Sequence, residues 1–284
     1  MLGMGIIMKI VLVFVSPNTT TKGVSEELKK VLTFEGHEAI TLNIGEKDNR
    51  EFDKIDFQLF EGVDLIGIGC PVYHLTLVEP MESFLQSALP KISKINPGIK
   101  AFLYFTYSGI TTGKAFDNAA RLLENSHIAL IGAAKIKAPH FFEVDGYPDE
   151  NAKEVIRLFC SRLSEKDFRP MAWDKAHAIF RKRKAIINII YPLAKIIGRL
   201  RKQAITISFD RCIGCRKCAD QCPVNAITMN RYAIRDPQKC MYCYHCAAIC
   251  PKGAIQCNVE QVYKMIRLNK KIVGTENPQN DIFV

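Results

Sequence analysis

Short apolar runs alternate with amphipathic stretches along the first 165 residues of the chain. Helical spacing of apolar positions predicts helices near residues 24–34, 79–88, 114–125 and 150–164. Apolar runs predict strands at residues 9–15, 38–44, 63–69, 100–107 and 128–136. Four of these runs are nearly continuous in apolar residues, which is typical of strands buried on both faces of a parallel sheet. The alternation of strands and helices therefore predicts an open α/β sheet.

Three loops at the carboxyl ends of these strands are candidates for ligand binding, because open α/β sheets bind ligands at that edge. Their sequences are SPNTTTK (16–22), CPVYHLTLVEP (70–80) and YSGITTG (107–113). The first loop leads into a helix, whose N-terminal amide groups favour a phosphate, and its hydroxyl groups add donors. Tyr73 and Tyr107 are placed to flank a flat ring, unless they are ordinary half-buried tyrosines. The candidate ligand-binding residues are Ser16, Asn18, Thr19, Thr20, Thr21, Tyr73, His74, Thr106, Tyr107 and Gly109.

The last third of the chain contains a duplicated cysteine pattern. Residues 212–223 (CIGCRKCADQCP) and 240–251 (CMYCYHCAAICP) both have the form C-x2-C-x2-C-x3-C-P. Soft thiolates suit iron–sulfur clusters, and three closely spaced cysteines can wrap three iron corners while a fourth ligand comes from elsewhere. A pair of zinc sites is the alternative, but zinc sites do not call for the third cysteine, the trailing proline and the duplication together. Cysteines grouped in this way indicate metal ligation in a reducing compartment rather than a secreted disulfide scaffold.

Residues 205–257 resemble the two-cluster bacterial ferredoxins, on the strength of these two runs and of the parallel continuations CPVNAIT and CPKGAIQ. In that family the fourth cysteine of each run ligates the cluster of the other run. The resemblance therefore implies two [4Fe–4S] clusters with crossed ligands. One would be held by Cys212, Cys215, Cys218 and Cys250, and the other by Cys240, Cys243, Cys246 and Cys222.

The N-terminal domain resembles flavodoxins, and the whole chain resembles bacterial proteins that fuse a flavodoxin-like domain to a two-cluster ferredoxin. This resemblance implies a sheet with strand order 2-1-3-4-5, a small α+β ferredoxin-like domain that follows it in the sequence, and FMN as a cofactor. The phosphate loop of flavodoxins usually runs S-x-T-G-x-T, which SPNTTT matches at Ser16 and Thr21. Asn18 and Thr19 replace the first threonine and the glycine, and a backbone without glycine approaches a phosphate less easily.

The chain is predicted to have four parts: a flavodoxin-like domain (1–170), a basic connector (171–204), the ferredoxin domain (205–257), and a C-terminal helix and tail (258–284). The net charge of +10 comes from residues 175–202, which hold nine basic and no acidic residues. Apolar residues at helical spacing opposite this basic face predict an amphipathic helix that Pro192 kinks. We expect it to pack on its own domains, with contact to a membrane surface or an acidic partner as alternatives. No nucleic-acid motif accompanies the charge, so nucleic-acid binding is not expected.

The N-terminal sequence MLGMGIIMKIVLVFV predicts a buried strand rather than a signal peptide, because it lacks a basic leading region and a small-residue cleavage site. No uncharged apolar run reaches the roughly 18 residues that a spanning helix needs. We therefore expect a cytoplasmic protein in an anaerobic or reducing setting.

Together these features predict electron transfer between FMN and two [4Fe–4S] clusters, with a protein redox partner. No side chain need act as an acid, a base or a nucleophile, and the chain contains no G-x-G-x-x-G dinucleotide motif. One alternative is a redox-responsive regulatory or scaffold protein whose flavodoxin-like fold is empty. Another is a reductase that acts on a small substrate bound over the flavin.

Overall fold

The N-terminal part of the protein is built on a six-stranded sheet. The structure, a computed structural model, describes residues 7–139, 144–181 and 205–284. Five parallel strands form most of the sheet: β1 (Lys9–Phe14), β2 (Glu38–Asn43), β3 (Leu65–Pro71), β4 (Lys100–Tyr107) and β5 (Ala129–Lys137). Their spatial order is β2-β1-β3-β4-β5, which confirms the order 2-1-3-4-5 expected from the sequence.

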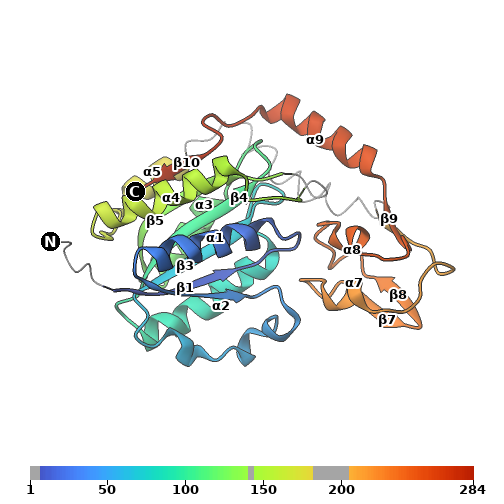
Figure 1. The fold of residues 1–284 in the computed structure, drawn as a ribbon, viewed down its shortest axis with the longest axis horizontal. Coiled ribbons are helices and arrows are strands. Elements are labelled where there is room, and N and C mark those ends of the chain that lie inside the picture. Colours follow the sequence, from blue (N-terminus) through green and yellow to red (C-terminus); the bar gives the residue numbers. More distant parts are fainter. Residues whose placement is uncertain (1–6, 140–143, 182–204) are drawn as a thin grey trace.

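Helices cover both faces of this sheet and give a three-layer α/β/α unit (Figure 1). Side chains of β1 alternate between two cores, with Ile10 and Leu12 in one and Val11 in the other. The first core is completed by α1 (Thr20–Phe34) and α4 (Glu150–Glu165). The second core is completed by α2 (Glu79–Ile95), α3 (Ala115–Asn125) and α5 (Trp173–Phe180). Three short 3₁₀ turns lie between β2 and β3: η1 (Lys47–Asn49), η2 (Phe52–Lys54) and η3 (Phe57–Phe60).

The sixth strand comes from the C-terminus of the chain and was not predicted from the sequence. The final strand, β10 (Asp281–Phe283), pairs antiparallel with β5 at the edge of the sheet. Phe283 packs edge-on against the rings of Phe116 on α3 and Phe180 on α5. The chain therefore returns to its first domain after the cysteine-rich segment, and the tail covers a sheet edge that would otherwise expose unpaired backbone groups.

The cysteine-rich segment forms a small second unit beside the sheet (Figure 1). Two antiparallel pairs make its framework: β6 (Ile205–Ile207) with β9 (Ile255–Cys257), and β7 (Ile227–Asn230) with β8 (Tyr232–Arg235). Two short helices, α7 (Lys217–Asp220) and α8 (His245–Ala248), lie within the cysteine runs. Its small apolar core consists of Ile205, Ile227, Ala233, Tyr242, Tyr244 and Ile255. This is the small α+β domain that the sequence predicts.

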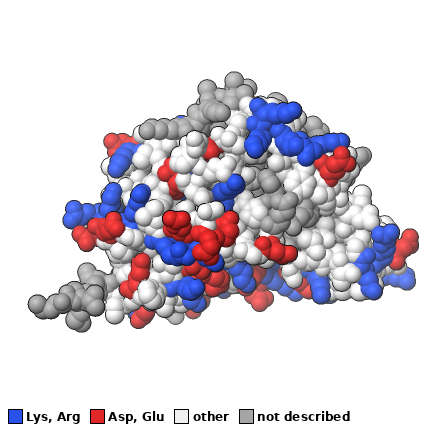
Figure 2. All heavy atoms as spheres, turned by 45° about the horizontal axis from the view of Figure 1, so that its top comes forward, with Lys and Arg blue, Asp and Glu red and all other residues white. Residues whose placement is uncertain are grey.

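A long exposed helix, α9 (Val259–Val273), connects this unit to the tail. Val273 is its only buried residue. The basic residues of α9 are Lys264, Arg267, Lys270 and Lys271, and basic side chains gather near the top of the view in Figure 2.

The predicted basic connector is described only in its first part. Helix α5 packs on the sheet domain, whereas residues 182–204, including Pro192 and most of the basic face, lie outside the described residues. The amphipathic-helix prediction for that segment stays a prediction. Among the helices that the structure describes, none has the length and apolar character needed to cross a membrane.

Candidate functional site

The two cysteine runs have the same backbone geometry, displaced by 28 residues. Each run contains left-handed residues that bend the chain around its cysteines. The equivalent pairs with positive φ are Gly214 and Tyr242, Arg216 and Tyr244, and Asn225 and Gly253. Both short helices, α7 and α8, begin directly after the second left-handed residue. The repeat in the sequence is therefore a repeat in the structure.

The last cysteine of each run accepts a hydrogen bond from a backbone amide four residues later. The amide of Ala226 lies 3.2 Å from Cys222 Sγ, and that of Ala254 lies 3.2 Å from Cys250 Sγ. Burial acts to raise the pKa of the Cys250 thiol, but hydrogen bonds from four backbone amides outweigh it and lower the pKa. These amides favour the thiolate form, which is the form that ligates metal.

Three cysteines of the first run line one cavity together with the last cysteine of the second run. The cavity is lined by Cys212, Cys215, Cys218 and Cys250, with Met229 and Ile255 among the apolar neighbours. These are the four cysteines that the resemblance to ferredoxins assigns to one cluster.

The other four cysteines are Cys222, Cys240, Cys243 and Cys246, of which Cys243 is buried and the rest are partly exposed. Burial raises the pKa of the Cys246 thiol to about 12, and the charges of Cys240, Cys222 and Cys218 act in the same direction. The pKa of Cys243 is also raised by burial and by the charges of Cys222 and Cys240. Buried thiolates at such short range need a positively charged metal core to stay deprotonated. The donor set therefore fits a cluster.

A single metal ion is a poorer fit to these cysteines. Within the described residues, no group of three or more histidine, cysteine, aspartate or glutamate side chains converges closely enough to hold one ion. A cubane has four separate iron corners, so its ligands do not need to converge on one point. His245, which lies within the second run, bonds Gln221 Oε1 at 2.8 Å through Nε2.

The loop at the start of α1 keeps the backbone turn of a phosphate loop. Thr19 is exposed and has a φ of 71°, in the position where the flavodoxin pattern has glycine. Ser16 Oγ accepts a hydrogen bond from the amide of Lys22 at 2.9 Å, which closes the loop onto the first turn of the helix. The N-terminal amides of α1 thus face the carboxyl edge of the sheet at the switch point between β1 and β3.

Several predicted ligand-binding side chains of this loop are turned into the core. The Thr21 hydroxyl lies 2.8 Å from that of Thr106, and Thr21 is 0% exposed. Thr20 donates to Asn18 Oδ1 at 3.1 Å, and both residues are buried. Contact between Thr21 and a ligand therefore requires local rearrangement, whereas Ser16 and Thr19 remain accessible.

Comparison with known proteins agrees with the geometry of the cysteines. Residues 211–254 match a family model described as a 4Fe-4S dicluster domain. This match favours a [4Fe–4S] cluster over a pair of zinc sites in that segment. The chain joins a flavodoxin-like domain to a ferredoxin-type domain.

Several solved flavodoxins are similar to the flavodoxin-like domain. One from the domain Archaea is 15% identical with a TM-score of 0.43, and covers 56% of this chain and 98% of its own. Oxidised flavodoxin 1 from Bacillus cereus is 18% identical with a TM-score of 0.42, and covers 55% and 97%. Fusobacterium nucleatum flavodoxin bound to flavin mononucleotide is 13% identical with a TM-score of 0.39, and covers 56% and 99%. The fold assignment rests on the strand order of the sheet. No curated protein matches the chain significantly.

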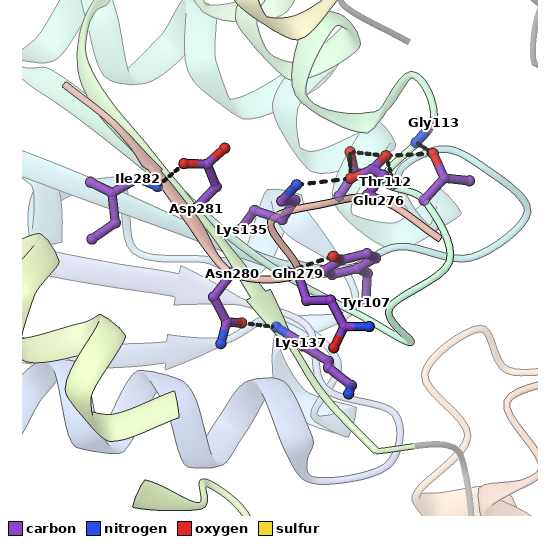
Figure 3. A network of polar contacts seen from close by, with 11 residues as sticks. Tyr107, Thr112, Gly113, Lys135, Lys137, Glu276, Gln279, Asn280, Asp281 and Ile282 are labelled. Atoms are coloured by element: carbon purple, nitrogen blue, oxygen red, sulfur yellow. Dashed lines mark hydrogen bonds and ion pairs between the residues drawn. The ribbon is translucent and has the colours of Figure 1, made fainter. Parts of the chain in front are cut away.

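The C-terminal tail covers the loop that follows β4 (Figure 3). The Tyr107 hydroxyl donates to the carbonyl of Gln279, and Lys135 Nζ lies 5.8 Å from the centre of the Tyr107 ring. Tyr107 is only 3% exposed, and Gly109 is buried as well. In this structure Tyr107 therefore has no open face to flank a ring, in contrast to its predicted role. Tyr73 is half-buried and His74 is exposed.

Glu276 on the tail is the centre of a polar network that sequence reasoning missed. Its carboxylate accepts from the Thr111 hydroxyl and from the Thr112 amide at 2.8 Å, and it pairs with Lys135 at 3.1 Å. The amide of Glu276 in turn donates to the carbonyl of Ile110. No local pattern marks Glu276, because its partners lie more than 130 residues away in the sequence.

The ferredoxin-type domain is attached to the carboxyl edge of the flavodoxin-like sheet. After β2, Arg50 donates to Asn225 Oδ1 at 2.8 Å and to the carbonyl of Asp220, and Lys47 pairs with Asp220 at 3.3 Å. Burial lowers the pKa of Arg50, and the nearby Cys222 opposes that shift. Arg50 therefore bonds residues on both sides of Cys222 in the sequence.

The second cysteine run contacts the loop after β3. Met241, between Cys240 and Cys243, packs against the core of the flavodoxin-like domain, as does Tyr73. Burial raises the pKa of the Tyr73 hydroxyl, and the nearby Cys243 raises it further. The loop that is predicted to flank the flavin thus adjoins a ligand run of the ferredoxin-type domain.

Proposed function

We propose that this protein passes electrons between an FMN in the flavodoxin-like domain and two [4Fe–4S] clusters in the ferredoxin-type domain. The observation that carries the proposal is the contact between the two domains: Met241, which lies between Cys240 and Cys243, packs against the core of the flavodoxin-like domain. Electron exchange requires the centres to be close, and fusion in one chain raises the effective concentration of one centre at the other.

Two clusters are supported by the two groups of four cysteines. One group lines a common cavity, and the other consists of the remaining cysteines of the two runs, Cys222, Cys240, Cys243 and Cys246. Each group contains one cysteine from the other run, as crossed ligation requires.

FMN is supported by the backbone of the loop that begins α1. Its phosphate would be held by Ser16, Thr19 and the N-terminal amides of the helix, and Tyr73 and His74 would lie at the ring. Bound FMN would supply a group that can take two electrons and release them singly. The chain's own residues would bind and orient that group.

A second candidate function is a redox-responsive regulatory or scaffold protein with an empty flavodoxin-like fold. It is favoured by the buried Thr21–Thr106 pair and by the tail over Tyr107, which close part of the predicted flavin site. The two functions differ in flavin content and not in iron content.

The partner and cellular setting follow from the same proposal. We infer a protein redox partner, because the chain offers no dinucleotide motif. Thiolate-ligated clusters fit a cytoplasm that is anaerobic or reducing. Contact of residues 175–202 with a membrane surface stays a proposal, supported only by their basic sequence.

The proposal is tested on protein that is purified without oxygen. We expect about eight iron and eight sulfide per chain, from two clusters of four, and one FMN. After rapid chemical reduction of the clusters, the flavin should be reduced at a rate that does not depend on protein concentration. A full complement of iron without flavin would favour the regulatory alternative. A rate that rises with concentration would contradict transfer within one chain.

A further inference from the structure

The two ligand runs share one backbone geometry but differ in their surroundings. In the first run Cys215 is exposed, and its neighbours Ile213 and Arg216 are exposed as well. In the second run the equivalent Cys243 is buried, and the equivalent of Arg216 is the buried Tyr244. The repeat therefore places one set of ligands at the surface and the other against the flavodoxin-like domain.

This asymmetry gives the ferredoxin-type domain an inner and an outer side. The inner side faces the flavodoxin-like domain: Arg50 of that domain bonds Asp220, two residues before Cys222, and Met241, two residues before Cys243, packs against its core. The outer side holds the cavity of Cys212, Cys215, Cys218 and Cys250. A centre on the outer side can be approached by a second protein without separating the two domains.

The outer cavity has a positive rim. Arg211, Arg216 and Lys252 line it, and no acidic residue belongs to its described lining. Asp210 is exposed next to Arg211 but lies outside this lining. A rim of one sign steers partners of the opposite sign toward the site.

Two large apolar side chains are exposed at the same place. Ile213 in the ligand run is 61% exposed, and Phe209, whose carbonyl accepts from the amide of Cys212, is 56% exposed. Exposed apolar side chains with a charged rim are the composition of a protein docking surface. A polyanion such as nucleic acid would use the cations but would leave these apolar groups without a partner.

We propose that the outer surface, formed by Phe209, Arg211, Ile213, Arg216 and Lys252, docks an acidic one-electron carrier protein. Electrons then enter or leave the molecule at the ligands Cys212, Cys215, Cys218 and Cys250, and the inner set serves the flavodoxin-like domain. The step from the inner set of cysteines to the flavodoxin-like domain rests on the proposed function, whereas docking of the carrier at the outer surface does not. Each encounter moves one electron between the carrier and the outer centre, and no bond forms or breaks.

The probe for the test is a plant-type [2Fe–2S] ferredoxin with a net negative charge. The ferredoxin is reduced chemically and mixed with the oxidised holoprotein, so that each ferredoxin loses one electron and the holoprotein gains it. Arg211→Glu combined with Lys252→Glu should lower the second-order rate constant at least about tenfold at low salt, and weaken calorimetric binding of the oxidised probe similarly. The wild-type rate constant should fall as salt is raised.

The repeat supplies a matched control. Lys239 precedes Cys240 as Arg211 precedes Cys212, and both are exposed. At about 0.15 M salt Lys239→Glu should change the rate constant less than the rim substitutions do, because Lys239 does not line the outer cavity and charges further apart than about 8 Å are largely screened there. If the double variant loses iron, the single variant Lys252→Glu replaces it in the same measurements. The docking surface would be overturned by any of three results: an effect of Lys239→Glu as large as that of the rim variants, an unchanged rate constant in the rim variants, or a wild-type rate constant that does not depend on salt.

The two proposals fail in distinguishable ways. Binding of the probe needs only the iron-loaded outer surface, whereas reduction of FMN needs transfer between the domains. Normal, salt-dependent binding without FMN reduction would remove the proposed function and leave the docking surface in place. Competition by a single-stranded DNA oligonucleotide at equal affinity would show a general polyanion site and overturn the assignment to an acidic protein.

Discussion

At the scale of single residues, the described structure contains a buried carboxylate that ties α5 to the flavodoxin-like domain. Asp117 on α3 bonds His177 Nδ1 at 2.7 Å and Arg181 Nε at 3.0 Å, and it pairs with Arg121 at 3.1 Å. Burial acts to raise the pKa of Asp117, but the hydrogen bond to His177 and the two arginine charges outweigh it and lower the pKa. The start of the connector is therefore held by a charged group.

Asp117→Asn should loosen α5 at neutral pH. The folded-state pKa of Asp117 lies below its value in the unfolded chain, so its stabilisation is complete above the unfolded pKa, near 4, and is lost as pH falls through the folded value. We expect a loss of about 1–3 kcal/mol at pH 7, because hydrogen bonds to charged groups are removed. The difference from wild type should shrink below about pH 4.

The fluorescence of Trp173, which lies on α5 with its ring 6.1 Å from that of His177, reports this loosening during urea unfolding. Asp174→Asn removes an exposed carboxylate from the same helix and is the control. An effect of Asp117→Asn that stayed constant from pH 7 to pH 4 and below would contradict a charged Asp117.

At the scale of elements, the cysteine runs and the tail are each defined by contacts between distant segments. In crossed ligation, Cys222 and Cys243 serve the same cluster. The double variant Cys222→Ala with Cys243→Ala should therefore lose one cluster and keep about four iron. Cys218→Ala with Cys222→Ala removes two cysteines of one run and should damage both clusters. Iron and sulfide analysis separates the outcomes, and the reverse pattern would show uncrossed ligation.

The tail should fix the loop after β4 through Glu276. Glu276→Gln leaves the buried Lys135 ammonium, which is 8% exposed, without its counter-charge. We expect a loss of about 1–3 kcal/mol in the free energy of unfolding. We also expect faster hydrogen exchange of the Thr112 amide, because that amide donates a hydrogen bond to the Glu276 carboxylate. Thermal unfolding and hydrogen-exchange mass spectrometry measure both effects. Adding Lys135→Met should recover part of the loss, and strictly additive effects would mean that the two groups do not interact.

At the scale of the whole molecule, the two domains are joined by contacts as well as by the chain. Arg50 provides two of the hydrogen bonds between the domains, next to Cys222. Arg50→Met should raise local opening at residues 220–226 about 10- to 100-fold, because each hydrogen bond contributes about 1 kcal/mol. Hydrogen exchange of that segment measures the change. Lys54→Met, on an exposed turn of the same region, should leave it unaltered. Unchanged exchange in the Arg50 variant would mean that this contact does not hold the domains together.

The sequence by itself determined most of the elements and the duplicated cysteine pattern. Most strands and helices up to residue 165 were predicted within a few residues, because each is specified by the period of its own apolar positions. The prediction for α2 was seven residues too short, since the helix continues to Ile95, and the three 3₁₀ turns were not predicted. The cysteine runs were recognisable because three ligands of each cluster lie within seven residues. The loop at the start of α1 was located because the end of a strand and the start of a helix are local features.

Only the tertiary structure decided what joins distant parts of the chain. Three contacts depend on which segments meet in space: the pairing of β10 with β5, the network of Glu276, and the hydrogen bond from Arg50 to Asp220. The same holds for the contrast between exposed Cys215 and buried Cys243, which occupy equivalent positions in one repeat. A local pattern fixes how a segment folds, whereas burial and charge at a site are set by whatever packs against it, and those neighbours are brought together by the fold.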